Sequence, residues 1–330
     1  MKMHWHWITI TSLVLSIGAA GDVRAQSGYP NKTVQIIVDS AAGSANDATA
    51  RILADKLSKI WGQQVLTLNQ PGAGGGISAR AASQSPADGY TLYMPATSPF
   101  LSLPGAPGVA PNLPIELPRD FVSIGFVLQQ PLFIGASHNS GINNLAQLIE
   151  LAKQKPGELT YAASGRGRLT HLTMELFQAR TGVKLQLVPY AGGPAQAMND
   201  VMSGRVHLIL DAYAGLAAAL KGNLIKGLAD TSLERLPGFE NLPTVAETVP
   251  NFFVGAWNVM LAPYGTPDAI VRKVHTDLRA ALDDPEVRSK FQANGAFVKH
   301  MSPEEVTAFV QSEQKTWRPI LEQLNRDTPK

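Results

Sequence analysis

The stretch TVQIIVDSAAGSANDATARILADKLSKIWG, residues 33–62, contains the unit that decides the fold. Its first six residues are rich in β-branched side chains, which is typical of a buried strand. A loop of small residues follows, after which Asp47 is placed to cap a helix that Gly62 ends. The apolar face of that helix is formed by Ala50, Leu53, Leu57 and Ile60. A strand, a short loop and an amphipathic helix make up the basic unit of an α/β fold.

The same alternation continues along the chain and predicts a largely parallel sheet. Further strands are expected at 64–68, 90–94, 122–127, 132–136, 159–163, 185–188, 206–210 and 224–228. Further helices are expected at 77–83, near 145–152, from 169 to Gly182, and at 194–203, 267–282, 285–294 and 303–324. Residues 99–118 carry six prolines and are expected to form a surface excursion. The long apolar runs near 122–136 and 252–261 are predicted to cross between two lobes, an arrangement that suggests a ligand cleft.

The first residues have the pattern of a secretory signal peptide. Lys2 is followed by an apolar stretch at 8–20, too short to span a bilayer, and by small residues at positions −3 and −1 of a cut after Ala25. A membrane anchor is the alternative interpretation. Removal of residues 1–25 is expected to leave an exported, soluble protein.

Composition excludes several classes of function. The charged fraction is 16%, and 28 Lys+Arg nearly balance 26 Asp+Glu, which argues against a nucleic-acid binder. The chain has no cysteine, which rules out disulfides, thiol nucleophiles and thiolate metal sites. Any chemistry must therefore come from the backbone, hydroxyl groups and a few charged side chains.

Three loops follow predicted strands and precede predicted helices: 39–46, 95–98 and 164–170. Ligands of open α/β sheets bind beyond the carboxyl ends of strands, and helix N-termini favour anions. Arg166 and Arg168 flank a glycine in the last of these loops, and one guanidinium could bind a carboxylate or a phosphate. The alternatives are that the small residues only turn the chain and that the arginines are solvated.

Other constellations support no catalytic or cofactor site. His171 and Glu175 share a helical face, but no third metal ligand lies nearby in the sequence, so no metal is expected. The loop 72–76, GAGGG, lacks the Lys-Ser/Thr of a P-loop, and no GxSxG or SxxK occurs. Asp211 follows a strand, where its carboxylate could orient a donor group of a ligand, pair with Arg205 or cap the next helix. Trp257 is interpreted as a core residue, with a stacking platform as the alternative.

Seven motifs in chain order resemble the Bug-type extracytoplasmic solute receptors, the periplasmic component of tripartite tricarboxylate transporters. Between about residues 29 and 309 they are VDSAAGSAND (38–47), NQPGAGG (69–75), PADGYTL (86–92), KPGELTYAASGRGRLTHL (155–172), VPYAG (188–192), LPTVAE (242–247) and APYGTP (262–267). The corresponding family patterns include N-R-P-G-A-G-G, P-x-D-G-Y-T-L and A-P-x-G-T-P. Several such motifs at compatible spacing make a chance match improbable.

The resemblance implies a type II periplasmic binding-protein fold, in which two α/β lobes joined by two crossover strands close over a small carboxylate in a central cleft. The expected bounds are 26–128 with 254–330 for lobe I and 129–253 for lobe II. The implied binding residues of the first lobe are Ala41, Ala42, Gly43, Ser44, Ala45 and Asn46, with Thr97 and Ser98 beside them. Those of the second are Ser164, Gly165, Arg166, Arg168, Thr170 and His171, with Tyr190 and Asp211 deeper in the cleft. A monomeric, non-enzymatic periplasmic protein without cofactor, delivering a carboxylate to membrane permease subunits, is the implied function.

The chain departs from the family pattern in its first ligand loop. Asp39 and Ser40 stand where proline and an aromatic residue are usual, and Ser44 replaces a glycine. Asp39 would repel an anion unless it points away, pairs with an arginine or binds a donor group of the ligand. Arg166 and Arg168, in place of small polar residues, could offset that charge, and a larger or aromatic carboxylate is expected. A sensory receptor for a membrane kinase, and a serine hydrolase with His171 near Ser164 or Ser98, remain alternatives.

Overall fold

The computed structural model describes residues 28–102, 109–190 and 193–327, so the predicted signal peptide lies outside the described residues. The strands are β1 Val34–Val38, β2 Val65–Asn69, β3 Thr91–Tyr93, β4 Phe121–Ala136, β5 Thr160–Ala163, β6 Gln186–Pro189, β7 Leu208–Ala212, β8 Lys226–Asp230, β9 Gly255–Pro263 and β10 Phe297–Val298. The helices are α1 Ala45–Trp61, α2 Gly76–Ser83, α3 Ser98–Leu101, α4 Leu145–Gln154, α5 Leu169–Thr181, α6 Pro194–Met202, α7 Tyr213–Lys221, α8 Asp268–Asp283, α9 Pro285–Ala293 and α10 Pro303–Asp327.

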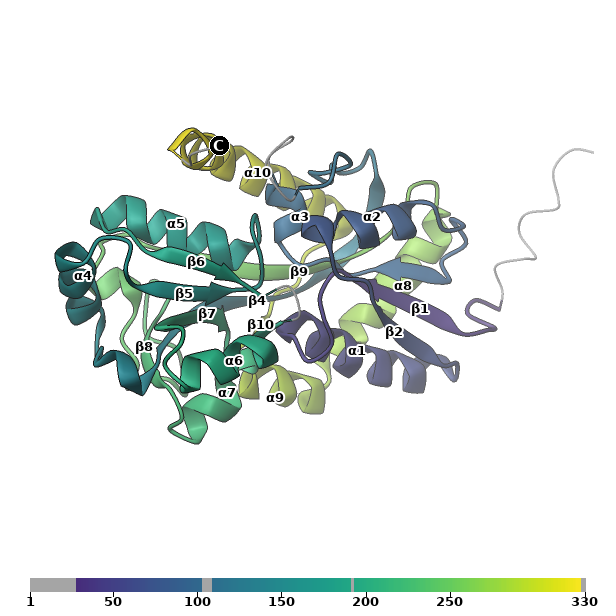
Figure 1. Ribbon diagram of the computed structural model, residues 1–330. Coiled ribbons are helices and arrows are strands. Elements are labelled where there is room, and N and C mark those ends of the chain that lie inside the picture. Colours follow the sequence, from purple (N-terminus) through teal and green to yellow (C-terminus); the bar gives the residue numbers. More distant parts are fainter. Residues whose placement is uncertain (1–27, 103–108, 191–192, 328–330) are drawn as a thin grey trace, which may run out of the picture.

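The strands form one sheet in the order β2-β1-β3-β9-β4-β7-β5-β6, with β8 and β10 also paired to β4. We call the part that carries β1, β2, β3 and β10 lobe I, and the part that carries β5 to β8 lobe II (Figure 1). Neighbouring strands are parallel in β2-β1-β3 and in β7-β5-β6, while β4 and β9 run antiparallel to their partners. The α/β class is therefore confirmed, and β4 and β9 are the strands that join the lobes. The exact lobe bounds stay a prediction.

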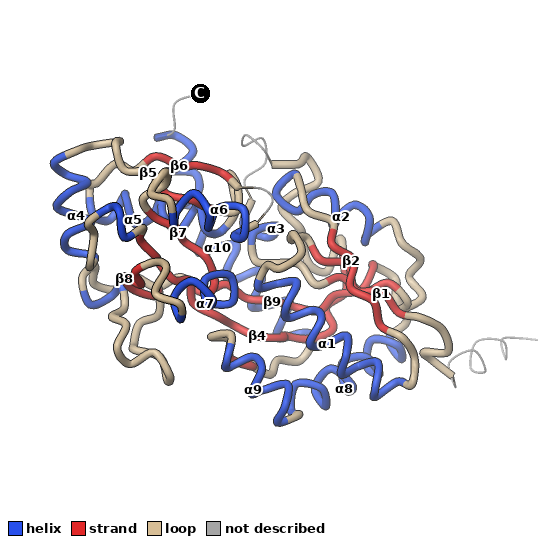
Figure 2. Tube along the Cα trace, turned by 60° about the horizontal axis from the view of Figure 1, so that its bottom comes forward, coloured by secondary structure: helices blue, strands red, loops and turns tan. Residues whose placement is uncertain are grey.

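Helices cover both faces of the sheet in each lobe, which is why four of the five residues in each of β1 and β7 are apolar. In lobe I, α1, α8 and α9 enclose one apolar core, and α2, α3 and α10 enclose another on the opposite face (Figures 1 and 2). In lobe II, α4 and α5 cover one face, and α6 and α7 cover the other. Among the described helices, none combines the length and the apolar character needed to cross a bilayer.

The crossing strand β4 is longer than the sequence pattern suggests. Two strands broken at 129–131 were expected, but β4 continues through Pro131. Its pairing with β9 ends at Pro131↔Gly255, and its pairing with β7 begins at Leu132↔Ala212. Pro131 therefore lies at the point where β7 replaces β9 as the partner of β4. Its fixed φ is compatible with extended backbone.

The expectation of a surface excursion at 99–118 is wrong for much of the segment. In its described parts, Phe100, Leu113, Ile115 and Leu117 are all less than 5% exposed and belong to the core between α2, α3 and α10. The prolines end regular structure here without excluding burial, because apolar side chains between them still pack inward.

The cap of α1 also differs from the prediction. Ser44, not Asp47, is the N-cap residue, and its hydroxyl accepts a hydrogen bond from the Asp47 N–H at 3.2 Å. The Asp47 carboxylate in turn accepts from the Gly43 N–H at 2.9 Å. Both residues therefore take part in holding the helix start, in an arrangement similar to a capping box.

Helix α10 contacts both lobes. Val306 and Val310, near its start, lie in the core of lobe I, whereas Trp317 and Leu321 lie in the apolar cluster of lobe II. Figure 1 shows its later turns lying over α5. The prediction placed all of 254–330 in lobe I, but the end of α10 packs against lobe II and gives the lobes a third connection.

Candidate functional site

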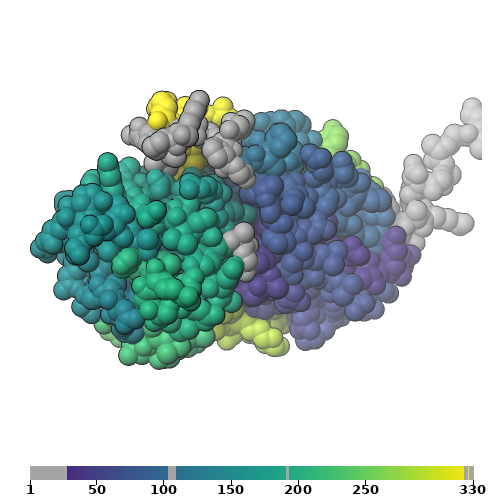
Figure 3. Space-filling model, in the orientation of Figure 1, coloured from purple at the N-terminus to yellow at the C-terminus, as the bar shows by residue number. Residues whose placement is uncertain are grey.

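A cavity of about 270 Å³ lies between the two lobes. Lobe I contributes residues after β1, β2 and β3, and lobe II contributes residues after β5 and β6 and at the end of β7. The crossing strands contribute Gln130, Leu132, Ala256, Trp257 and Asn258. The two lobes are in contact along one seam on the face shown in Figure 3. A cavity of this kind between two lobes is where a small ligand is expected to bind.

Four helices begin at the wall of this cavity. Lining residues lie at the N-terminal ends of α1, α5, α6 and α7, namely Ser44, Arg168, Gly193 and Ala212 at the N-cap positions. All four helices have at least nine residues. Each helix N-terminus carries a partial positive charge and contributes typically about 0.3–1 kcal/mol toward an anion. Their convergence gives the cavity an electrostatic preference for negative charge.

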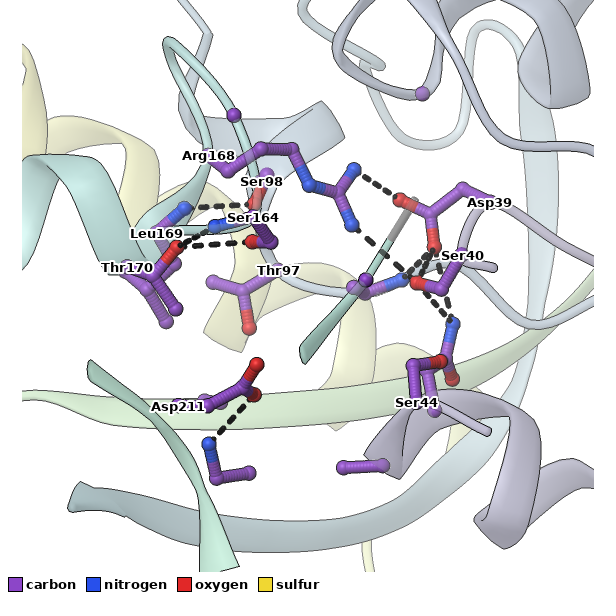
Figure 4. A pocket seen from close by; sticks show the side chains of 18 of the residues that line it. Asp39, Ser40, Ser44, Thr97, Ser98, Ser164, Arg168, Leu169, Thr170 and Asp211 are labelled. Atoms are coloured by element: carbon purple, nitrogen blue, oxygen red, sulfur yellow. Dashed lines mark hydrogen bonds and ion pairs between the residues drawn. The ribbon is translucent and has the colours of Figure 1, made fainter. Parts of the chain in front are cut away.

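An ion pair crosses the cavity from one lobe to the other. A terminal guanidinium nitrogen (Nη1) of Arg168 lies 2.7 Å from Asp39 Oδ2, and the second (Nη2) lies 3.3 Å from Ser40 Oγ (Figure 4). The Asp39 side chain has no solvent exposure, and that of Arg168 is 14% exposed. The arginine therefore neutralises the unusual carboxylate of the first ligand loop, one of the three arrangements expected for Asp39.

Asp39 is further held by groups of its own lobe. Its Oδ1 accepts hydrogen bonds from the Ala96 N–H at 2.9 Å and from the Asn46 side-chain amide at 3.0 Å. Asn46 also accepts a hydrogen bond from Asn258 of β9 at 2.8 Å. The buried carboxylate, the start of α1 and a crossing strand are thus joined in one hydrogen-bonded network, which fixes the position of the first loop.

A second contact joins the lobes at the start of α5. The Leu169 N–H donates to Ser98 Oγ of lobe I at 2.9 Å. Beside it, the Thr170 hydroxyl lies 2.8 Å from Ser164 Oγ and accepts from the Ser164 N–H at 3.1 Å. Ser98 thus caps a helix that belongs to the other lobe, so the first turn of α5 is positioned by both lobes.

Asp211 lies on the lobe II wall, at the end of β7, with its carboxyl group directed toward the middle of the pocket (Figure 4). Its Oδ1 accepts from the Ala212 N–H at 2.7 Å. Burial raises the pKa of the Asp211 carboxyl to about 6, although the Ala212 N–H and the charge of Arg168 act in the opposite direction. Three roles were considered for this carboxylate. It faces the cavity, where it could orient a ligand, and it accepts a hydrogen bond from the backbone just before α7. It does not pair with Arg205, which pairs with Asp200 instead.

The structure brings most of the predicted binding residues together. The cavity is lined by Ala41, Ser44, Ala45, Asn46, Thr97, Ser98, Ser164, Gly165, Arg166, Arg168, Thr170 and Asp211. Ala42 and Gly43 are exposed and do not line it. Their role as ligand contacts, like the binding role of the whole set, stays a prediction.

His171 and Tyr190 lie near the cavity but do not line it. His171 Nδ1 accepts the Gly167 N–H at 3.2 Å, and burial lowers the pKa of the imidazole, which keeps this nitrogen an acceptor. The ring therefore supports the loop that carries Arg166 and Arg168. Tyr190 donates to Asp200 at 2.5 Å and lines only a small second pocket behind the cavity.

Several lining residues were missed by sequence reasoning. Residues 71–75 follow β2, and because β2 pairs in parallel with β1, their loop lies beside the first ligand loop. The motif 69–75 stands out in the sequence for its glycines. The strand predicted just before it was the signal that this loop could lie at the same edge of the sheet as the first ligand loop. Gln130 and Asn258 lie inside crossing strands, where no motif marks a polar side chain as facing a cavity.

No catalytic or metal constellation is evident among the described residues. Neither Ser164 nor Ser98 has a hydrogen bond to His171, the base that the hydrolase alternative requires. Within the same described ranges, there is no group of three His, Asp or Glu side chains that could hold a metal ion.

Comparison with known proteins identifies consistent relatives. Residues 49–326 match the sequence profile described as "Tripartite tricarboxylate transporter family receptor". Protein BugT of Bordetella pertussis is 31% identical over 310 residues, which is 93% of this chain and 94% of BugT. The structure of Rhodopseudomonas palustris Rpa4515 with adipate has a TM-score of 0.83 at 31% identity, covering 90% of this chain and 98% of that one. MatC of the same organism, with bound malate, has a TM-score of 0.79 at 26% identity, covering 89% and 100%.

Proposed function

The chain belongs to the tripartite tricarboxylate transporter family of receptors, and from this premise we propose that it captures a small organic carboxylate in the cavity between its lobes. The observation that carries the proposal is the convergence of four helix N-termini on one cavity. Adipate in Rpa4515 and malate in MatC support the same class of ligand for related receptors.

Capture proceeds by closure of the lobes over the ligand. The ligand bridges both walls, so it binds the closed form more tightly than the open form and shifts the equilibrium only by that difference in affinity. The crossing strands β4 and β9 contain the hinge, because they are the strands common to both lobes. The Asp39–Arg168 pair and the hydrogen bond from the Leu169 N–H to Ser98 are two contacts that form when the lobes close.

We further propose that residues 1–25 direct export to the periplasm, where family receptors act, and that the mature chain works as a monomer. It delivers its ligand unchanged to permease subunits in the membrane. A binding role without turnover is supported by the family and by the hydrogen bonds of Ser164 and Ser98, which engage Thr170 and Leu169.

Binding is tested by thermal unfolding of residues 26–330 with aliphatic, aromatic, di- and tricarboxylates, with sugars as controls. A ligand at 100 times its Kd adds about 2.7 kcal/mol of stability, which raises Tm by several degrees. The expected result is a shift for one carboxylate class, with the compound recovered intact. No shift with any carboxylate would refute the proposal, and recovery of a converted product would replace it with an enzymatic function.

A further inference from the structure

Four charged side chains line the cavity among the described residues: Asp39, Asp211, Arg166 and Arg168. Their formal charges sum to zero, so the preference for an anion rests on the helix N-termini and on the way these four groups are paired. The pairing is unequal, because one acid is fully satisfied by the protein and the other is not.

Arg168 is occupied by the protein itself. Besides Asp39 and Ser40, its guanidinium lies 3.4 Å from the carbonyl oxygen of Gly74. Asp39 is buried and receives hydrogen bonds from three further groups, Ser40, Asn46 and Ala96. Separating this pair to bind a ligand carboxylate would leave Asp39 buried without its counter-charge, which is strongly unfavourable. Arg168 is therefore committed to closing the cavity.

Asp211 is only half satisfied. Its Oδ1 accepts the Ala212 N–H, whereas Oδ2 has no hydrogen-bond partner among the described residues and faces the pocket (Figure 4). Arg168, the nearby cation whose charge acts on it, already serves Asp39. At pH 7.5 the carboxyl is largely ionised and offers an acceptor to whatever occupies the cavity.

Gln130 provides a second polar side chain on the cavity wall. It lies on β4 and is only 5% exposed, and its side-chain amide has no hydrogen bond to any described residue. The amide is not one of the fully buried polar groups without a partner, so it opens on the cavity, where it can bind a ligand. Asp211 and Gln130 are thus both available to polar groups in the cavity.

We propose that the ligand carries, besides its carboxylate, an ammonium or hydroxyl group that donates a hydrogen bond to Asp211 Oδ2. The preferred class is therefore an amino or hydroxy acid rather than an unsubstituted dicarboxylate, whose second carboxylate would face Asp211 with like charge. Gln130 accepts from the same donor group or donates to the ligand carboxylate. The inference rests on the proposed function and specifies its substrate class.

Calorimetric titration of residues 26–330 at pH 7.5 with matched compounds tests this. The pairs are succinate with malate and aspartate, adipate with 2-aminoadipate, and benzoate with 4-hydroxybenzoate. At least one donor-bearing compound is expected to bind tenfold or more tightly than its parent. D211N is expected to lose this preference, because the amide removes the ionic acceptor. D268N, which removes an exposed carboxylate of α8 that does not line the cavity, serves as the matched control and is expected to retain it.

Three outcomes would overturn the proposal. Equal affinities within every pair, or a preference that D211N keeps, contradict it while leaving carboxylate capture intact. Binding of no carboxylate at all refutes the proposed function as well. The wild-type comparison alone decides the question if D211N fails to fold, since a donor preference is expected only when an acceptor faces the ligand.

Discussion

At the scale of single residues, Asp39 is a carboxylate without solvent exposure in a protein whose ligands are expected to be anions. Its presence is tolerated because Arg168, from the other lobe, supplies the counter-charge. A buried pair of this kind contributes little over an apolar pair, but the loss of one partner is costly. The pair is therefore best understood as a contact that specifies one arrangement of the lobes.

We expect R168M to destabilise the protein by about 3 kcal/mol, because it leaves the Asp39 carboxylate buried and uncompensated. D39N should cost less, and the double variant D39N/R168M should recover part of the loss, giving a coupling energy of about 1 kcal/mol or more. Urea unfolding of the four proteins measures this. The matched comparison is the exposed Lys59–Asp55 pair of α1, where K59M should have little effect. A coupling energy near zero would show that the two charges act independently.

Asp211 leads to a prediction about pH. Its pKa is raised from 3.8 to about 6, so the folded state holds the proton more tightly than the unfolded state. The folded protein is therefore penalised when this carboxyl is ionised, fully above about pH 6 and not at all below about pH 4. D211N should be more stable than wild type by about 2–3 kcal/mol at pH 7.5, with the difference vanishing toward pH 4. Unfolding measured without ligand across this range checks it, and a pH-independent difference would contradict the assigned pKa.

At the scale of secondary-structure elements, the strand–loop–helix units were predictable because apolar periodicity and glycine stops are local signals. The β1–loop–α1 unit was found within a residue or two, and a serine three residues before Asp47 was a local signal for the true cap. The positions of Gln130 and Asn258 were not predictable. Both faces of a strand shared by two lobes are buried, so no alternation of polar and apolar residues shows which side chains face the cavity. Residues 71–75 line the cavity because β2 pairs with β1, and this pairing joins segments that are distant in the sequence.

Helix α10 shows how an element can restrain the lobes. Trp317 is 7% exposed and packs in the cluster of lobe II, although the helix starts in lobe I. Opening the cavity must therefore move α10 with one lobe or detach its later turns from the other. The exposed Pro319 within the helix marks a point where its hydrogen-bond ladder is already interrupted.

We expect W317A to lower the free energy of unfolding by about 3 kcal/mol, since it removes a large buried side chain and leaves a cavity. The neighbouring exposed Thr316 provides the control, and T316A should change stability by less than about 0.5 kcal/mol. Chemical denaturation measures both. Equal stability of the two variants would mean that the end of α10 does not pack on lobe II in solution.

At the scale of the whole molecule, two lobes meet along a seam and are joined there by an ion pair and a helix cap. Both contacts are made by groups of the protein itself, so they favour the closed arrangement in addition to whatever a ligand contributes. Each 1.4 kcal/mol that such contacts contribute changes the ratio of closed to open molecules tenfold. A ligand then needs to supply only the rest of the free energy that separates the open from the closed form. Its apparent affinity rises with the fraction of molecules that are already closed.

This argument predicts the effect of D39N on shape. Removing the carboxylate deletes the charge attraction across the seam, so ligand-free D39N should populate the open form more than wild type and show a larger radius of gyration by small-angle X-ray scattering. Saturating carboxylate should return both proteins to the same value, because the bound ligand bridges the lobes. D55N, which removes a carboxylate from the exposed pair on α1, should scatter like wild type throughout. If ligand-free D39N and wild type are indistinguishable, the Asp39–Arg168 pair stabilises the loops without biasing closure, and the anion site alone must drive it.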